Sequence, residues 1–400
     1  MSKKKILYVC NSGVFGGATR SLYELLKGLP QDKYDFYFIS SAGTTIPFYK
    51  SISVDLIESK GISKIDNTKY SYYRGLRWLI LLRELLFLPY TINAFYKAKK
   101  QWGKMDMIHL NEITNIPALM LSGIFFKDTP IVMHVRSINR RAGFIAPILE
   151  RIISKSVRQI VAIDNYVKES LPYDKVKIVH NSMSMIQTET DTKLLERLKE
   201  IGEGGFKIGF VGNFLKSKGL EDLIDAFVML KREGLPIKCL VLGDQIRKEH
   251  FLGSILTALN ITQDPKKEIL EKITANGLER DVILLGKSYD LSSFYSHIDV
   301  LCFPSHLEAP GRPVFESAFF KKPSIVAVAH SDEDCFVDKE TGLAVLEKTP
   351  SSIYDAIKYF YEHPEECRRM GNNAYDMAMK NFNQSRNSKK MDDIYDSLIQ

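Results

Sequence analysis

The chain has 400 residues, of which 45% are hydrophobic and 26% are charged, so it is long enough for two ordinary globular domains. Its five cysteines are scattered and form no CxxC pair. This excludes a disulfide framework and a cysteine zinc site, and predicts a reducing, cytoplasmic location. Residues 1–200 carry 30 Lys and Arg against 18 Asp and Glu, whereas residues 201–400 carry 25 against 30. The basic first half predicts an anionic partner, although an ordinary soluble surface explains the same charge.

The first half of the chain alternates short apolar runs with longer helical patterns. Near-continuous runs of Val, Ile and Leu predict parallel strands that are buried on both faces. The first run follows only a short basic stretch, which is too brief for a secretory signal and predicts a buried strand instead. The strands predicted in this half are Ile6–Cys10, Phe36–Ser40, Met107–Leu110, Ile131–Val135, Ile160–Ile163 and Val176–Val179.

A glycine-rich turn follows the first predicted strand. Gly13, Gly16 and Gly17 lie between this strand and a helical pattern. Glycines at such a turn let a phosphate approach the backbone, but the spacing differs from GxGxxG. By itself, therefore, the turn is weak evidence for a binding site.

Residues 74–104 are rich in leucine and aromatic residues and carry seven Lys or Arg against one acid, Glu84. Arg83, Glu84, Pro89 and Asn93 interrupt the apolar run, which argues against a spanning helix of about 20 apolar residues. The pattern suits an amphipathic pair of helices on an anionic membrane surface, which would place the protein peripherally at the inner face of the membrane. Helices buried against the first domain are an equally good interpretation.

Basic residues also follow the predicted strand at Ile131–Val135. His134 ends this strand, and Arg136, Arg140 and Arg141 come directly after it. A basic loop at this place suits an anionic or lipid-diphosphate acceptor, with simple surface charge as the alternative.

The strand and helix pattern starts a second time after residue 205. We therefore predict a first domain over residues 1–185, a linker over 186–205, a second domain over 206–382, and a final helix over 383–400 that returns to the first domain. The strands predicted in this half are Ile208–Val211, Ile237–Leu242, Val282–Leu285, Val300–Phe303, Ser324–Val328 and Leu343–Leu346.

The most informative stretch is residues 304–326. Glu308 and Glu316 stand eight residues apart after a predicted strand, with Gly311 between them and Pro313 where a helix would begin. This spacing places Glu308 on a loop and Glu316 in the first turns of the helix. The open backbone at Gly311 suits a phosphate or sugar contact.

On these residues the chain resembles the retaining family 4 glycosyltransferases of the GT-B fold. That fold consists of two Rossmann-like α/β domains whose parallel sheets face an interdomain cleft. The shared signature comprises Pro304, Ser305, Glu308, Gly311, Glu316, Lys322 and Pro323. The resemblance implies that Glu308 contacts the hydroxyl groups of the donor sugar, that Glu316 contacts the nucleotide ribose, and that no metal or other cofactor is required.

The resemblance extends over most of the chain. Residues 209–227 match the segment that grips the diphosphate, where Lys218 is the basic ligand and Asn213 replaces a usual arginine. His134 matches a histidine that touches the donor sugar near the reacting carbon, and Asn181 fits a further strand-end position. The implied catalytic residues are Glu308, His134 and Lys218. The implied donor-binding residues are Gly16, Gly17, Gly212, Asn213, Lys218, Gly243, Gly311, Arg312 and Glu316.

A second departure from the family pattern covers residues 329–334. This segment lacks the usual glycine pair and contains Asp332, Glu333 and Asp334, which also spell the D-x-D motif of a different glycosyltransferase fold. The surrounding sequence does not suit that fold, so we expect no metal site there. The loop instead predicts an unusual donor sugar or a different mode of closure.

These patterns predict a glycosyltransferase that moves a sugar from a nucleoside diphosphate donor to a glycan or lipid-linked acceptor in surface polysaccharide biosynthesis. Retention of the anomeric configuration is implied by the resemblance. Two alternatives stay open: a nucleotide-sugar epimerase of the same fold and a non-catalytic scaffold. Asn213 and the altered loop at 329–334 favour the scaffold.

Overall fold

The computed structural model describes residues 2–184, 190–202, 204–244, 265–307, 309–328 and 332–399. The chain divides into two compact units. The first unit comprises Met1–Ser184 and Asn381–Gln400, and the second comprises Met185–Lys380. Each unit is built on one parallel sheet, so the predicted architecture of two Rossmann-like α/β units is confirmed.

The sheet of the first unit has the strand order β3-β2-β1-β4-β5-β6-β7. Six of these strands coincide with predicted runs, and β3 is additional. Its burial alternates along the strand because it lies at the sheet edge, so it lacks a continuous apolar run. The strands are β1 (Lys4–Cys10), β2 (Tyr34–Ser41), β3 (Asp55–Ser59), β4 (Met107–Leu110), β5 (Ile131–Val135), β6 (Gln159–Ala162) and β7 (Val176–Ile178).

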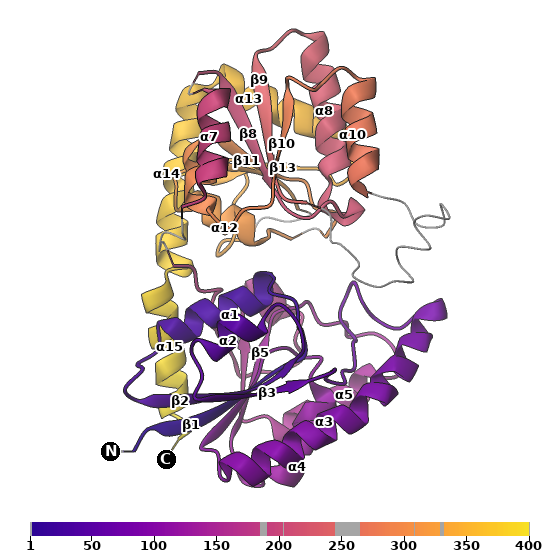
Figure 1. Cartoon of the computed structure of the whole chain (residues 1–400), viewed down its shortest axis with the longest axis vertical. Helices are drawn as coiled ribbons and strands as arrows, with labels where there is room; N and C mark the ends of the chain where they lie inside the picture. The colour runs from indigo at the N-terminus through magenta and orange to yellow at the C-terminus, as the bar shows by residue number, and fades with distance from the viewer. Residues whose placement is uncertain are drawn as a thin grey trace. The chain divides into compact units, whose positions relative to one another are not determined.

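Helices cover both faces of this sheet (Figure 1). Leu7 and Val9 of β1 pack into the core beneath α3, α4 and α5, whereas Ile6 and Tyr8 pack into the core beneath α1 and α15. This alternation explains why the strand is apolar from Ile6 to Cys10. The helices are α1 (Gly17–Lys27), α2 (Ile46–Lys50), η1 (Gly75–Leu79), α3 (Ile80–Trp102), α4 (Ile116–Phe125), α5 (Ala146–Ser156), α6 (Asn165–Glu169) and α15 (Gln384–Asp396).

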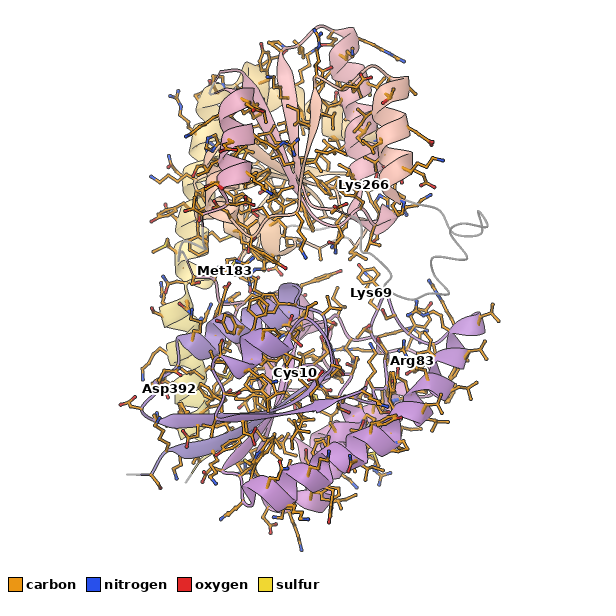
Figure 2. All side chains as sticks on the ribbon, viewed as in Figure 1. Cys10, Lys69, Arg83, Met183, Lys266 and Asp392 are labelled. Atoms are coloured by element: carbon orange, nitrogen blue, oxygen red, sulfur yellow. The ribbon has the colours of Figure 1, made fainter. Side chains whose placement is uncertain are left out.

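The final helix, α15, is fixed to the first unit by buried polar contacts. The Tyr395 hydroxyl lies 3.0 Å from the Tyr8 hydroxyl and 2.7 Å from His109 Nδ1. Asp392 accepts hydrogen bonds from the Lys33 ammonium and the Tyr34 hydroxyl at 2.7 and 2.6 Å. Figure 2 marks Asp392 on this helix. The last turns of the chain therefore complete the core of the first unit.

The second unit has the strand order β10-β9-β8-β11-β12-β13. All six strands coincide with predicted runs: β8 (Phe206–Val211), β9 (Ile237–Leu242), β10 (Val282–Gly286), β11 (Val300–Phe303), β12 (Ser324–Ala327) and β13 (Gly342–Val345). The helices are α7 (Thr192–Ile201), η2 (Lys216–Lys218), α8 (Leu220–Arg232), α10 (Pro265–Ala275), α11 (Leu291–Ser296), α12 (Arg312–Ala318), α13 (Pro350–Glu362) and α14 (Pro364–Asn381). Helix α7, within the range predicted as a linker, packs against α11 of this unit.

Residues 74–104 form a short 3-10 turn and one long helix, so the predicted pair of helices is wrong. Helix α3 continues through Pro89, and the Thr91 hydroxyl donates to the Phe87 carbonyl in the same region. Residues Gly75–Trp102 are long and apolar enough to cross a membrane by length and composition. Phe95 and Ala98, however, are fully buried in the core of the first unit.

Candidate functional site

Each sheet offers a site beside its central strand. In both units the second and third strands lie on one side of the first strand, and the fourth strand pairs with the first strand on its other side. The crevice at this switch point, beyond the carboxyl ends of the strands, is the common ligand site of such folds. In the first unit it lies beyond β1 and β4, and in the second unit beyond β8 and β11.

In the second unit the two loops at the switch point are held together. The Ser217 carbonyl, in η2, accepts hydrogen bonds from the His306 amide at 2.9 Å and the Ser305 hydroxyl at 3.2 Å. The His306 ring lies 2.6 Å from an Asp222 carboxylate oxygen. Gly219 has a φ of 72°, and an added Cβ would stand 2.0 Å from the Pro304 carbonyl oxygen. The loop after β8 and the loop after β11 therefore form one rigid edge.

Lys218 lies on this edge, and its ammonium contacts an aromatic ring. Its Nζ stands 5.4 Å from the centre of the Phe303 ring. Apart from that ring, no hydrogen bond or ion pair joins this ammonium to the residues that the structure describes. Burial lowers the pKa of Lys218, as expected for a cation without a carboxylate partner. Such a cation suits an anionic ligand.

Glu316 is buried in α12 behind the same edge. One carboxylate oxygen accepts from Arg312 Nε at 2.6 Å, and the other accepts from the Tyr295 hydroxyl at 3.0 Å. Gly311 is the N-cap of α12, so the predicted placement of Glu316 in the helix after Gly311 matches the structure. A ligand hydroxyl would share the carboxylate with Arg312 and Tyr295. Glu308 lies outside the described residues.

The remaining predicted residues of the second unit lie around the ends of β8 and β9. The Gly212 amide donates to the Leu242 carbonyl, and Asn213 is exposed. Gly243 has a φ of 153°, and a Cβ there would stand 1.9 Å from the Gly212 carbonyl oxygen. Gly243 therefore has a packing role of its own, and its contact with a nucleotide stays a prediction.

In the first unit the switch point contains a network centred on Arg136. The guanidinium donates to Asn111 Oδ1 at 2.6 Å, to Asn181 Oδ1 at 2.7 Å and to His134 Nδ1 at 3.3 Å. These acceptors follow or end three different strands, β4, β5 and β7. The sequence analysis named Arg136, His134 and Asn181, but neither Asn111 nor the contacts that join these side chains.

Two titratable groups adjoin Arg136. Removal from water raises the pKa of Glu112, although hydrogen bonds from the Ile113 amide and the Ser137 hydroxyl offset part of this rise. Burial, followed by the charge of Arg136, lowers the pKa of His134 far below its ordinary value. The His134 side chain is 1% exposed, so this residue is a neutral, buried histidine. Its contact with a donor sugar stays a prediction.

A cavity of about 200 Å³ adjoins this network within the first unit. Cys10, marked at the end of β1 in Figure 2, forms part of its wall. The lining is mostly polar and includes Ser12, Thr19, Lys64, Asp66, Asn111 and Glu112. Hydroxyl, amide and carboxylate groups both donate and accept hydrogen bonds, which suits a ligand with many hydroxyl groups.

The other predicted residues of the first unit differ in whether the structure already gives them a contact. Nothing lies within 4 Å of an added Cβ at Gly16 or Gly17, so both keep the backbone at the start of α1 open. Arg140 lies 4.0 Å from the Tyr72 ring centre. Arg141 donates to the carbonyls of Glu169, Ser170 and Leu171, and its guanidinium therefore caps the end of α6.

The acidic segment Asp332–Asp334 folds as a tight turn. The Asp332 amide donates to the Phe336 carbonyl, and the Asp334 side chain is mostly buried. Within the described ranges, no group of three or more His, Cys, Asp or Glu side chains is placed to hold a metal ion. Residues 329–331 of the altered loop lie outside those ranges.

Family models match both halves of the chain. The model described as "Glycosyl transferases group 1" matches residues 192–377, and the model described as "Glycosyltransferase Family 4" matches residues 15–183. These two ranges include the switch-point loops of the two units.

Curated relatives are similar over much of the chain. The capsular polysaccharide biosynthesis glycosyltransferase CapM of Staphylococcus aureus is 24% identical over 363 residues, covering 88% of this chain and 91% of CapM. The D-rhamnosyltransferase WbpZ of Pseudomonas aeruginosa is 26% identical over 298 residues, covering 68% of this chain and 65% of WbpZ.

Solved structures share the fold. Anabaena HepE in complex with UDP matches with a TM-score of 0.74 and 18% identity, covering 98% of this chain and 100% of HepE. Sucrose-phosphate synthase of Thermosynechococcus elongatus matches with a TM-score of 0.71 and 15% identity, covering 99% of both chains. The fold is therefore GT-B, as predicted.

Proposed function

We propose that this chain, whose two halves match glycosyltransferase family models, transfers a sugar from a nucleoside diphosphate donor to a saccharide acceptor. The observation that carries the proposal is the ammonium of Lys218 at the switch point of the second unit, which has no ion-pair partner among the described residues. The names of relatives such as CapM support a role in the assembly of a surface polysaccharide.

Lys218 would hold the diphosphate of the donor. A diphosphate supplies the negative charge that this ammonium lacks among the described residues, and it gains charge as the bond to the sugar breaks. The contacts of Ser217 with Ser305 and His306 fix the backbone beside Lys218 before the ligand arrives. A fixed cation stabilises the departing group without a reorganisation cost. The bound UDP in the HepE structure supports this class of donor.

Glu316 would bind the nucleotide ribose. Its carboxylate is already oriented by contacts that include Arg312 and Tyr295. A carboxylate oxygen can accept more than one hydrogen bond, so a ribose hydroxyl would share the carboxylate with these side chains.

The acceptor would bind in the cavity of the first unit. The positive charge of Arg136 is engaged by Asn111, Asn181 and His134, and Glu112 lies beside it. The cavity therefore offers hydrogen bonds rather than a free cation, which favours the neutral hydroxyl groups of a saccharide. The carboxylate of Glu112 is fixed by Ser137 at 2.8 Å.

We further propose a retaining, metal-independent transfer in which positioning and leaving-group stabilisation do the chemical work. Glu308 would contact the donor sugar, as the resemblance implies. The charge of Lys218 would compensate in part for the arginine that Asn213 replaces.

The experiment is a screen of UDP- and GDP-sugars for transfer, with calorimetry of nucleoside diphosphate binding to the wild type and Lys218→Ala. We expect Lys218→Ala to weaken diphosphate binding by about 10- to 100-fold, because a charge-assisted contact is lost, and to leave nucleoside binding unchanged. Lys216→Ala is the matched control, since Lys216 is exposed and pairs with Glu268 at 3.6 Å.

Three outcomes contradict the proposal. Equal losses for Lys218→Ala and Lys216→Ala would remove the phosphate role of Lys218. Conversion of the donor without transfer to any acceptor would indicate an epimerase. An absence of binding to every nucleotide tested would indicate a non-catalytic scaffold.

A further inference from the structure

The outer face of η1 and α3 is apolar where a surface helix is normally polar. Leu76, Leu79, Leu82, Leu85 and Leu86 are between 60% and 85% exposed. At about 100° per residue, Leu82, Leu85 and Leu86 fall on the side of α3 opposite its buried residues. Only 22% of the most apolar window of this helix is buried, so packing does not account for its composition.

Aromatic contacts extend this apolar surface to the start of α5. The Trp78 ring stacks between Tyr73 and Phe144, with ring centres 5.3 and 5.8 Å away. Phe144 is 73% exposed and Ile148 is 57% exposed. We call the combined surface the leucine face; its members are Leu76, Leu79, Leu82, Leu85, Leu86, Phe144 and Ile148. An exposed apolar surface of this kind marks an interaction site.

Cations accompany the leucine face. Residues 74–104 carry seven Lys or Arg and one acid, and residues 139–158 carry five and one. The acid in the first segment, Glu84, is buried and paired with Arg83, so it adds little negative charge to the surface. Lys97, Lys100 and Lys104 are exposed at the other end of α3. Figure 2 marks Arg83 on this helix.

Helix α3 is held along the surface of the first unit. Glu84 accepts from the Lys64 amide at 2.9 Å, and the Thr91 hydroxyl accepts from the Ser63 amide at 2.8 Å. Phe95 and Ala98 are fully buried in the core. A helix fixed in this way presents its outer face to a flat apolar phase without entering it end-on.

We propose that the leucine face docks the first unit onto an anionic lipid bilayer. The leucine side chains enter the boundary between headgroups and acyl chains, and the flanking cations pair with anionic headgroups. A second copy of this chain fits less well, because a symmetric interface would bring two sets of like charges together. This inference goes beyond the transfer reaction, and its test requires no turnover.

The test uses the full chain and phosphatidylcholine vesicles with and without phosphatidylglycerol. We expect flotation with the anionic vesicles, weakened by added salt. The sequence has two tryptophans, and Trp102 is buried while Trp78 adjoins the leucine face. Trp78 fluorescence should therefore shift to the blue on binding and be quenched by brominated lipid.

Matched variants separate the two contributions. L82Q/L86Q should lower the vesicle partition coefficient by at least about tenfold, because two apolar side chains leave the bilayer boundary. L270Q/L346Q is the control in the second unit, where both leucines are exposed, and should bind as the wild type does. K97E/K100E should abolish the preference for phosphatidylglycerol.

Three results would overturn the proposal. One is equal flotation of L82Q/L86Q and the wild type, with both confirmed as folded by their thermal transitions. A second is an absence of vesicle binding by the wild type. A third is a concentration-dependent dimer that L82Q/L86Q abolishes, because a second copy would then cover the leucine face.

Discussion

The switch points of the two units each contain a cation, but the two cations differ in their contacts. In the first unit Arg136 is satisfied by three side chains from neighbouring strand ends, with Glu112 at its side. In the second unit Lys218 faces only an aromatic ring among the described residues. The same strand order thus supports one site whose cation is engaged in hydrogen bonds and another whose cation is available among the described residues.

This difference teaches what each site is suited to bind. A polar cavity whose neighbouring cation is already hydrogen-bonded offers donors and acceptors of fixed direction, and these suit the hydroxyl groups of a saccharide. A half-buried cation pays a desolvation cost that an arriving anion relieves. The burial of Lys218 thus lowers the stability of the second unit and, by the same free energy, favours the binding of a phosphate ligand.

The largest expected effect concerns the glycine that joins the two loops of the second unit. Gly219→Ala forces a left-handed φ on alanine and brings its Cβ to 2.0 Å from the Pro304 carbonyl oxygen. We expect a loss of about 4 kcal/mol in the unfolding free energy of the second unit. Urea titration followed by hydrogen exchange would localise this loss.

The control in the first unit is Gly16→Ala. The φ of Gly16 is −124°, and nothing lies within 4 Å of its added Cβ, so its cost should stay below about 0.5 kcal/mol. Similar losses for the two variants would contradict the view that only the loops of the second unit are locked.

The next effect concerns the two cations. Arg136→Ala leaves Asn111, Asn181 and His134 without their donor, and we expect the first unit to lose about 3 kcal/mol of stability. Lys218→Ala should change the stability of the second unit by less than about 0.5 kcal/mol, because it removes a desolvated charge. Both tryptophans lie in the first unit, so their fluorescence follows its unfolding selectively. A larger loss for Lys218→Ala would reverse the comparison.

The effect that is smallest at neutral pH is the pH dependence that His109 gives to the first unit. Burial, and then the charge of Arg136, lower the pKa of His109 from 6.5 to about 3. In the unfolded chain His109 binds a proton below about pH 6.5, whereas in the folded unit it binds this proton only below about pH 3. The stability of the first unit therefore falls as the pH decreases from about 6.5 to about 3. The contribution of His109 is at most about 1.4 kcal/mol per pH unit.

His109→Gln would test this contribution. Between about pH 6.5 and pH 3, the unfolding free energy of the first unit, followed by tryptophan fluorescence, should decrease less in the variant than in the wild type. The difference is the contribution of His109. A slope identical to that of the wild type would show that His109 is not responsible. The second unit provides an internal reference, because His109 lies in the first unit.

The strands could be predicted because most are buried on both faces and therefore contain nearly continuous apolar runs. The edge strand β3 was missed, since only alternate residues face a core. Lys218 was found through the resemblance of residues 209–227, and Glu316 through its spacing from Glu308 and Gly311. His134 and Asn181 were named, but Asn111 and the contacts of Arg136 were not found, since Asn111 and Asn181 are 25 and 45 residues away and meet Arg136 only through the sheet. His306 and Asp222, 84 residues apart, illustrate the same point.

The docking of α15 has a consequence for synthesis of the chain. The second unit is one continuous segment, Met185–Lys380, and has all its residues once that segment has emerged from the ribosome. The first unit begins the chain but needs Met391, Ile394 and Tyr395 in its core. Its final packing must therefore wait until α15 has emerged from the ribosome, so the unit whose first residues are translated first is the later of the two to become complete.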